Sequence, residues 1–473
     1  MRHLFMGICC IFLVIMSAYS QQDTVVESSI RDQQSVAVTI YNDDLGMIKD
    51  IRSISLATKS GELRFGDVAS HIIPASVHVR SINASDEFKI FEQNYEYDLM
   101  NPDKLLDKYV GKEISVITFN ENTNEKQETR ARLLSNNEGQ ILKIGDKIFL
   151  GHPGYRALPR IPENLIARPT LMWQYGNTGP GTQRLQVSYL TKQIGWQADY
   201  VLVIDESDNF GDLSGWVTID NRSGATYNNA SLKLVAGNIN RVKKRRPEMF
   251  DSARMMKYGA GAPQFEEQGF FEYHLYDLQR KTTIKNNQTK QIQLMNAGDI
   301  GLDKQYVVKG EQHYFFSPYR TNDPKRPVNV ELRVKNSKKN NLGMPLPAGT
   351  VRMYKQDADG SQQFVGEDRI EHTPKNEEIT LTAGEAFDIV AERKQTDFEQ
   401  IGAGAYESAW EISLRNHKDS DITVTVEEPL SGDWKVVTRS HEFEKMDAST
   451  IRFAVRVAKN GEAKVRYRVR VKR

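Results

Sequence analysis

The chain has 473 residues and carries 63 Lys plus Arg against 62 Asp plus Glu, so its formal net charge is +1. A charge this close to zero gives no global attraction to nucleic acid or to an anionic membrane surface. Both cysteines, Cys9 and Cys10, lie in the N-terminal apolar segment, which excludes a disulfide framework for the rest of the chain. The length suits roughly three domains of ~150 residues, held together by packing alone.

The N-terminal segment has the three parts of a secretory signal. Arg2 and His3 supply a positive start, residues 4–16 form an apolar run, and small side chains lie just before Gln21. We expect 1–20 to be a signal peptide that is removed before Gln21. An uncleaved anchor helix is the alternative, but a bilayer span needs ~20 apolar residues, more than this run has.

Export places the mature chain in the periplasm or outside the cell. A mature chain without cysteines suits a bacterial envelope better than a eukaryotic extracellular space. No apolar run after residue 20 is long enough to cross a bilayer, so we expect no transmembrane span in the mature chain.

Residues 21–100 are predicted to form an N-terminal β domain. Val36, Val38 and Ile40 alternate with polar residues, and a similar alternation recurs over 48–56. Such a period of two, interrupted by turn residues, is typical of strands with one buried face.

Residues 101–168 are predicted to form a small module with the one clear helix of the sequence, over 102–110. Asn101 can cap this helix, Pro102 suits its first position, and Gly111 suits its end. Short alternating segments with Asn- and Gly-rich turns follow. We expect them to form a small barrel-like insertion.

Residues 170–473 return to short alternating segments, and we expect an Ig-like β-sandwich there. The overall fold class is therefore predicted to be all-β. Over 241–269 the alternation is replaced by a basic run, scattered Met residues and a Gly-Ala repeat. We interpret this stretch as a mobile loop that interrupts the sandwich.

The last two predicted strands alternate most regularly. Apolar residues occupy every second position over 451–457 and again over 465–471, with Asn-Gly at 460–461 between them. Asn-Gly between two such runs predicts a two-stranded hairpin. Basic residues occupy the intervening positions, so we expect the opposite face of this hairpin to be in contact with water.

Several long stretches of the C-terminal half carry a resemblance to a known family. They are Tyr189-Leu190-Thr191, Trp196-Gln197-Ala198-Asp199-Tyr200, Asn221-Arg222-Ser223-Gly224, Leu346-Pro347-Ala348-Gly349-Thr350-Val351-Arg352, Gly366-Glu367-Asp368, His372-Thr373-Pro374, Ala391-Glu392-Arg393-Lys394-Gln395-Thr396-Asp397-Phe398 and Gly432-Asp433-Trp434. Over 170–473 the chain resembles the exported proteins called domain of unknown function 4139. The N-terminal part is similar to the leader region of that family and of the mucoidy-inhibitor-like proteins, without the long coiled coil of the latter. The resemblance implies a β-rich, envelope-associated protein and supplies no catalytic residues.

The candidate binding residues are Glu367, Asp368, Arg369 and His372. They bring two carboxylates, a guanidinium and an imidazole together within a few positions, and loops on rigid sandwiches often carry function. The alternative is a strand edge with local hydrogen bonds. The histidines that follow the signal show no metal-ligand spacing, so we expect no metal site, and no motif indicates another cofactor.

Two classes of function remain open. The first is a non-catalytic envelope or extracellular binding or structural module, whose partner is an envelope polymer or a protein and not a nucleic acid. The second is a hydrolase acting on envelope polysaccharide or peptide, with acids drawn from 367–377. No catalytic residue is assigned, because the sequence contains no Gly-x-Ser-x-Gly and no other local catalytic signature, although a sandwich can host a site without one.

Overall fold

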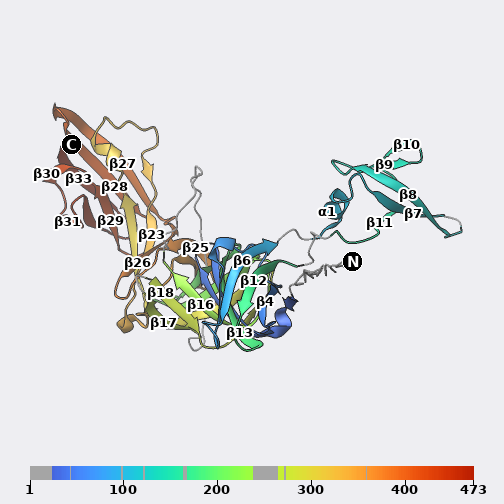
Figure 1. Cartoon of the computed structure of the whole chain (residues 1–473). Coiled ribbons are helices and arrows are strands. Elements are labelled where there is room, and N and C mark those ends of the chain that lie inside the picture. The colour runs from blue at the N-terminus through green and yellow to red at the C-terminus, as the bar shows by residue number, and fades with distance from the viewer. Residues whose placement is uncertain are drawn as a thin grey trace, which may run out of the picture. The chain divides into compact units, whose positions relative to one another are not determined.

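Strands make up most of the computed structural model (Figure 1). The residues that it describes are 24–42, 44–96, 100–120, 123–162, 168–237, 265–270, 273–357 and 359–472. The predicted all-β class is confirmed. The expected signal peptide, 1–20, lies outside the described residues, and no helix among those described has the length and apolar character that a membrane crossing requires.

Two compact units divide the chain. One comprises Met1–Ser35 and Lys49–Tyr189, and the other comprises Val36–Ile48 and Leu190–Arg473. Strands β2 (Gln33–Tyr41), β3 (Leu45–Ser55) and β13 (Thr182–Thr191) each contribute residues to both units. Short 3₁₀ turns are interspersed at η1 (Ile30–Asp32), η2 (Pro74–Ser76), η3 (Gln312–Phe315) and η4 (Lys338–Asn340).

The first unit contains a four-stranded sheet in the order β1-β4-β12-β6. Its strands are β1 (Thr24–Ser28), β4 (Lys59–Phe65), β12 (Thr170–Asn177) and β6 (Phe88–Glu96), and β5 (His78–Ser81) pairs separately with β13. Trp173 is fully buried, as its alternation with Leu171 and Tyr175 predicts, and its ring meets Phe65 edge-on at 5.7 Å. Its indole N–H donates to Gln93 Oε1 at 2.9 Å, which satisfies the polar end of the buried ring.

A buried arginine also stabilises this unit. Arg52 has no exposed surface, and its Nη2 lies 2.8 Å from Asp50 Oδ2. Its Nη1 donates to the carbonyl oxygen of Ser28 at 3.2 Å, and the guanidinium carbon lies 3.6 Å from the centre of the Phe65 ring. The charge is therefore compensated by a carboxylate, a peptide carbonyl and an aromatic face, as a buried charge requires.

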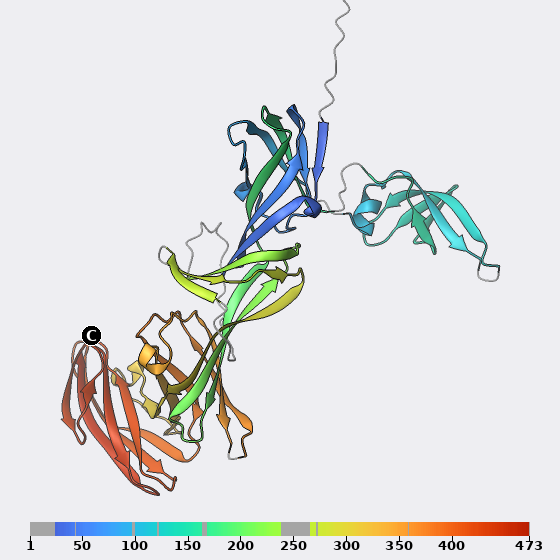
Figure 2. The ribbon, with the colours of Figure 1, turned by 90° about the horizontal axis from the view of Figure 1, so that it is seen from below.

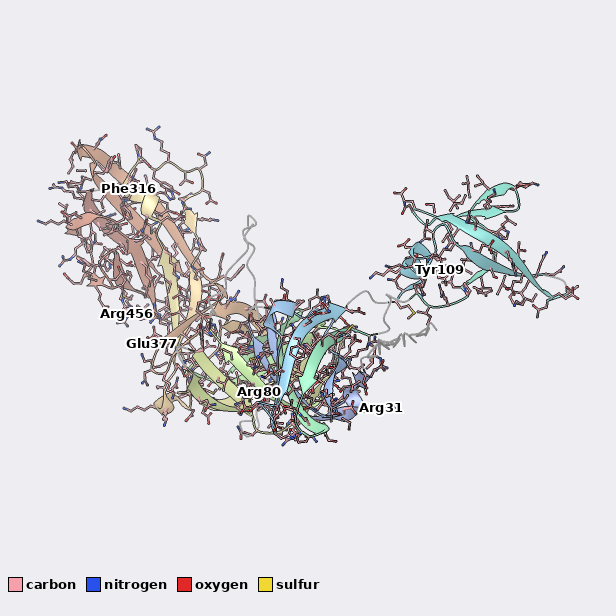
Figure 3. All side chains as sticks on the ribbon, in the orientation of Figure 1. Arg31, Arg80, Tyr109, Phe316, Glu377 and Arg456 are labelled. Carbon is pink, nitrogen blue, oxygen red and sulfur yellow. The ribbon has the colours of Figure 1, made fainter. Side chains whose placement is uncertain are left out.

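The small module has one short helix and an open sheet. The strands follow the order β10-β9-β8-β7-β11, with bounds β7 (Glu113–Phe119), β8 (Lys126–Ser135), β9 (Ile141–Ile144), β10 (Lys147–Leu150) and β11 (Tyr155–Ala157). The expected barrel-like closure is wrong: β10 and β11 are the two edges, and among the described residues they do not pair. Tyr109 (Figure 3) and Leu106 instead pack against one face of the sheet, in a core with Val116 and Leu133.

The helix of this module, α1 (Pro102–Asp107), is shorter than predicted. Asn101 caps it as expected, because its Oδ1 accepts from Lys104 N at 2.9 Å. The chain leaves the helix before Gly111, whose N–H donates to the carbonyl oxygen of Leu133 at 2.6 Å. Backbone pairing with β8 therefore ends the helix earlier than its sequence pattern indicates.

In the second unit, three strands pair with β16 (Tyr227–Ala236). It pairs in parallel with β2 and antiparallel with β18 (Tyr273–Leu278) and β19 (Thr282–Ile284), while β17 (Phe265–Phe270) pairs with β18. The predicted loop over 241–269 lies mostly outside the described residues, but its last five residues belong to β17. The sequence of β17 alternates only weakly between apolar and polar residues, so its strand structure depends on pairing with β18.

The middle sheet of the second unit has the order β20-β15-β14-β24-β25. Its strands are β14 (Ile194–Ile204), β15 (Phe210–Asn221), β20 (Gln288–Gly301), β24 (Gly349–Gln356) and β25 (Gln362–Ile370). One face is apolar and buried, with Trp196, Tyr200, Val217 and Val351 in its core. The other face carries mostly polar side chains, with Val201 and Trp216 between them.

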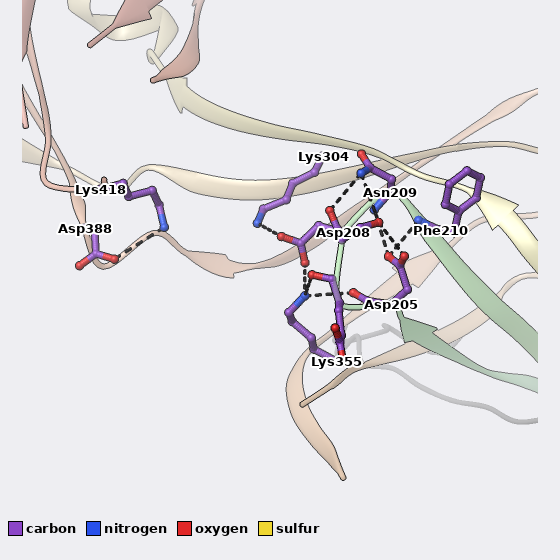
Figure 4. A network of polar contacts seen from close by, with 10 residues as sticks. Asp205, Asp208, Asn209, Phe210, Lys304, Lys355, Asp388 and Lys418 are labelled. Carbon is purple, nitrogen blue, oxygen red and sulfur yellow. Dashed lines mark hydrogen bonds and ion pairs between the residues drawn. The ribbon is translucent and has the colours of Figure 1, made fainter. Parts of the chain in front are cut away.

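The turn between β14 and β15 is fixed by two lysines (Figure 4). Lys355 Nζ lies 3.0 Å from the carbonyl oxygens of both Asp205 and Glu206 and 2.5 Å from Asp208 Oδ1, and Lys304 Nζ lies 2.6 Å from Asp208 Oδ2. Burial alone would raise the pKa of Asp208, but the hydrogen bonds from both lysines hold it below its usual range. The ammonium group of Lys355 thus occupies a cage of oxygen atoms in the turn.

The C-terminal region is a sandwich of two sheets, seen as two layers of strands in Figure 2. One sheet has the order β26-β23-β21-β29-β32-β31, with β26 (Glu378–Glu385), β23 (Asn329–Lys335), β21 (Asp303–Lys309), β29 (Ile422–Pro429), β32 (Thr450–Val457) and β31 (Glu444–Lys445). The other has the order β22-β27-β28-β33-β30, with β22 (Lys325–Arg326), β27 (Ile389–Gly402), β28 (Ala405–Asn416), β33 (Glu462–Lys472) and β30 (Asp433–Arg439). The buried side chains of both sheets form one core.

The expected hairpin over 451–471 is wrong, although its alternation and turn are right. Strands β32 and β33 belong to opposite sheets of the sandwich. Their apolar faces meet across the core, where the rings of Phe453 and Tyr467 are stacked with centres 5.4 Å apart. Asn460, with φ of 50°, makes the turn between the two layers. A hairpin would have placed the same side chains next to each other on one sheet.

A second buried arginine joins these two sheets. Arg393 on β27 donates from two nitrogens to both carboxylate oxygens of Glu428 on β29, at 2.6 and 3.1 Å, and neither side chain is exposed. The guanidinium also lies over Tyr314 and Trp410, 5.1 and 5.6 Å from the ring centres. Burial would lower the pKa of Arg393, but the Glu428 carboxylate raises it, so the arginine stays charged.

Candidate binding face

The candidate residues identified in the sequence lie on and just after β25. Successive side chains of a strand point to opposite faces, so Glu367 and Arg369 share one face and Asp368 has the other. Glu367 Oε2 accepts from Arg352 Nε on the neighbouring β24 at 3.4 Å. Arg369 is exposed, and no carboxylate of the described residues forms an ion pair with it.

Asp368 has a structural position. Its Oδ2 accepts from the backbone N–H of Thr382 on β26 at 2.8 Å, and its Oδ1 accepts from Arg369 N at 2.8 Å. Gly366 supports the same junction, because a Cβ at this position would collide with the carbonyl oxygen of Ala383. The stretch Gly366-Glu367-Asp368 therefore holds β25 close to β26.

His372 lies after the strand and is directed elsewhere. Its Nδ1 accepts from the backbone N–H of Ala348 at 3.0 Å. Partial burial of the ring lowers the pKa of His372 and outweighs the nearby Glu371 carboxylate. The structure thus brings Glu367 and Arg369 together on one face of the sheet and separates them from both Asp368 and His372.

The face that carries Glu367 and Arg369 continues across the whole middle sheet. Paired residues of neighbouring strands point to the same side, so the register defines rows of side chains. These rows are Gly195–Asp220–Thr289, Gln197–Thr218–Gln291, Asp199–Trp216–Gln293, Asp199–Thr350–Arg369 and Arg352–Glu367. We call this surface the polar face. Asp199 and Thr350 are themselves buried, so the exposed polar groups lie on either side of them.

Hydrogen bonds order one side of the polar face. Gln291 Nε2 donates to Thr218 Oγ1 at 3.2 Å, and Thr218 Oγ1 donates in turn to Asp199 Oδ2. Arg222 Nε lies 3.2 Å from Asp220 Oδ2. Fixed donors and acceptors of this kind need no reorganisation when they bind a partner.

An open groove of about 700 Å³ lies along this side. The lining residues are mostly polar: Asn42, Asp44, Gln193, Ile194, Gly195, Trp196, Gln197, Thr218, Asp220, Arg222 and Thr289. The indole N–H of Trp196 donates to the carbonyl oxygen of Val235 at 3.2 Å, and its ring is buried in the core. The groove therefore offers amides, hydroxyls, one Asp–Arg pair and the carboxylate of Asp44, and no exposed tryptophan ring.

A comparison with known families agrees with the resemblance found in the sequence. The model of the family described as Domain of unknown function (DUF4139) matches residues 185–473, more than half of the chain. The chain belongs to this family. No curated protein is similar enough to count as a match. The polar face lies within the family region, and Gln197, Asp199, Arg352 and Glu367 come from the stretches that carried the resemblance.

Sequence reasoning missed the part of the face on β14, β15 and β20. Gln197 and Asp199 alternate with buried residues, a signal visible in the sequence, but Thr218 and Gln291 join them only through the strand register. Within the described residues, no group of three or more His, Cys, Asp or Glu side chains is placed to hold a metal ion.

Proposed function

We propose that this protein is an exported, non-catalytic module that binds a hydroxyl-rich envelope polysaccharide along the polar face and its groove. The groove with its cross-strand rows is the observation that carries the proposal. Neighbouring strands repeat the polar groups every ~4.8 Å and alternate residues of one strand every ~6.8 Å, a periodic display that suits an extended polymer.

The chemistry of the groove favours a neutral, hydroxylated ligand. Gln197, Gln291 and Thr289 each offer both a donor and an acceptor, as a sugar hydroxyl does. The charges of Asp220 and Arg222 compensate each other across 3.2 Å, and the remaining charge of the lining, Asp44, disfavours an anionic ligand.

A binding assay beside a turnover assay tests this function. The mature chain is incubated with glycans extracted from a bacterial envelope, and both retained glycan and newly released reducing ends are measured. The double variant Gln197→Ala/Gln291→Ala is expected to lose about tenfold in affinity, given roughly 0.5–1.5 kcal/mol for each hydrogen-bonding side chain. Asp368→Ala, on the other face of the strand, is the control that should keep binding.

Two outcomes would contradict the proposal. Glycan retention unchanged in the double variant would show that binding occurs elsewhere. Release of reducing ends that disappears in Asp368→Ala or His372→Ala would favour a hydrolase instead. Export itself is tested by measuring the intact mass of protein from an exporting host. A mass equal to that of a chain starting at Gln21 supports export, and a mass that includes residues 1–20 contradicts it.

A further inference from the structure

The outward face of the small sheet presents a row of cations. Arg130 and Arg132 lie two positions apart on β8, so they point to the same side, opposite to the buried Ala131 and Leu133. Lys143 on β9 is the direct partner of Arg132. Three cationic groups of two adjacent strands thus meet on one face.

In the described ranges of the chain, these cations form no direct ion pair, although Glu128 on the same strand attracts Arg130 at longer range. Among the described residues, no carboxylate forms an ion pair with Arg130, Arg132 or Lys143, although Glu113 is paired with Arg132 in the strand register. The only ion pair on this face joins Lys126 to Glu128 at 2.9 Å within the described part of the module. An anionic partner could therefore bind these three cations without first breaking an ion pair within the protein.

Large apolar side chains flank the cations on both edges. Ile148 and Leu150 on β10 are 62% and 84% exposed, and Tyr155 on β11 is 71% exposed. The ring of Tyr155 lies 6.2 Å from that of Phe119 on β7, which is also exposed. A row of cations between two apolar strips is unusual for a face that meets only water.

We propose that this face binds an acidic polysaccharide, with uronate-type carboxylates on Arg130, Arg132 and Lys143 and sugar rings against Tyr155 and Phe119. Arg recognises carboxylates with paired hydrogen bonds, and aromatic rings offer a large contact area at low entropic cost. The cations separate the two apolar strips, so the face lacks the continuous apolar surface that an acyl layer requires. Glu113 and Glu128 interrupt the positive row, which disfavours a strand with a phosphate at every unit.

Affinity electrophoresis of the full mature chain through gels with and without alginate, a polyuronate, tests the proposal. Retardation is expected in alginate and not in dextran, a neutral polysaccharide, and it should weaken as salt screens the charges. The triple variant Arg130→Gln/Arg132→Gln/Lys143→Gln is expected to bind alginate about tenfold more weakly, at roughly twofold for each exposed charge pair.

The matched control removes the same charge elsewhere. Lys335, Lys339 and Lys375 are exposed and form no ion pair among the described residues. Their triple replacement by Gln should leave alginate binding within about twofold. Arg130→Lys/Arg132→Lys keeps the charge but loses the paired hydrogen bonds, so its affinity should lie between those of the unmodified chain and the triple variant. This graded loss guards against misreading a folding defect.

Three results would overturn the proposal. Equal losses in the two triple variants would reduce the effect to net charge. Alginate binding unaffected by the first triple variant would place the site elsewhere. Binding to anionic lipid vesicles or to a thymidine oligonucleotide, with none to alginate, would assign the face to a different class of partner.

Discussion

The β22-β27-β28-β33-β30 sheet of the C-terminal sandwich and the small sheet of the first unit both place arginines at every second position of a strand. In the described part of the chain, the arginines form ion pairs on the first sheet and none on the second. On β33, Arg466, Arg468 and Arg470 face acids of β28: Arg466 Nε lies 2.6 Å from Glu411, and Arg470 Nη2 lies 2.9 Å from Glu407. On β8, Arg130 and Arg132 lie opposite Ser115 and Glu113 of β7 and form no ion pair among the described residues.

The difference shows that a basic strand pattern does not by itself identify a binding surface. Both strands have the alternation of one buried and one exposed face. The adjacent strand decides whether the exposed charge is already neutralised, because paired residues lie only ~5 Å apart. A face whose cations are compensated is a stabilised surface, whereas a face whose cations are not is available to an anionic partner.

The largest expected effect is on stability and comes from Arg393, which is buried on the core side of the sheet that carries Arg466 and Arg470. Arg393→Ala leaves the Glu428 carboxylate buried without its counter-charge, so the free energy of unfolding should fall by about 3–5 kcal/mol. Urea unfolding followed by tryptophan fluorescence measures it. Arg470→Ala, on the exposed face of the same sheet, is the control and should cost under ~1 kcal/mol.

The double variant Arg393→Met/Glu428→Leu sharpens this test. Removing both charges avoids the uncompensated carboxylate, so it should recover most of the lost stability. Equal destabilisation by the single and double variants would contradict the account of Arg393 as a charge partner and indicate packing alone.

Removing acids from the sheet that contains β28 and β33 should leave its arginines without ion pairs, as on the small sheet, and so allow it to bind alginate. Glu407→Gln/Glu411→Gln leaves Arg466 and Arg470 without the carboxylates that they contact. Binding to alginate by this sheet should then appear as an increase of about threefold over the unmodified chain. Unchanged alginate binding would show that free cations on a sheet face are insufficient without flanking apolar groups.

The reverse change, adding an acid to the small sheet, should weaken its binding to alginate. Ser115 lies opposite Arg130, and Ser115→Glu places a carboxylate where β28 provides one to β33. Alginate affinity should fall about threefold, since one of three cations becomes compensated. Ser115→Gln, similar in size and uncharged, is the matched control, and a similar loss in both variants would indicate a steric effect.

The sequence predicted local features well and pairings poorly. Asn101 caps α1, and the alternation over 451–457 and 465–471 marks the buried faces of two strands. The hairpin was wrong because a hairpin and a crossover between two layers have the same alternation and the same turn. Only the packing of Phe453 against Tyr467 across the core distinguishes them, and that contact depends on every other strand of the sandwich.

The candidate site shows the same limit. Glu367, Asp368 and Arg369 are neighbours in the chain, yet the strand directs Asp368 away from the other two, toward the backbone of Thr382. Thr218 could not be assigned to the same surface from the sequence, since its row depends on strand register. Residues that are close in sequence can share a site when they lie on a loop. On a strand, adjacent residues point to opposite faces and are separated.

The smallest expected effect concerns pH and distinguishes the two sheets again. Hydrogen bonds from Arg470 and, next, Arg468 outweigh the modest effect of burial and lower the pKa of Glu407 below its usual range. A depressed pKa in the folded state stabilises the protein above the ordinary carboxyl pKa, and this stabilisation is lost as the pH falls through the depressed value. The difference in melting temperature between the unmodified chain and Glu407→Gln should therefore be greatest near neutral pH and shrink below about pH 4. Gln127→Ala, on β8 of the small sheet, changes no hydrogen bond or ion pair to a carboxylate among the described residues and should show a pH-independent difference. A constant difference for Glu407→Gln as well would contradict the assigned role of its carboxylate.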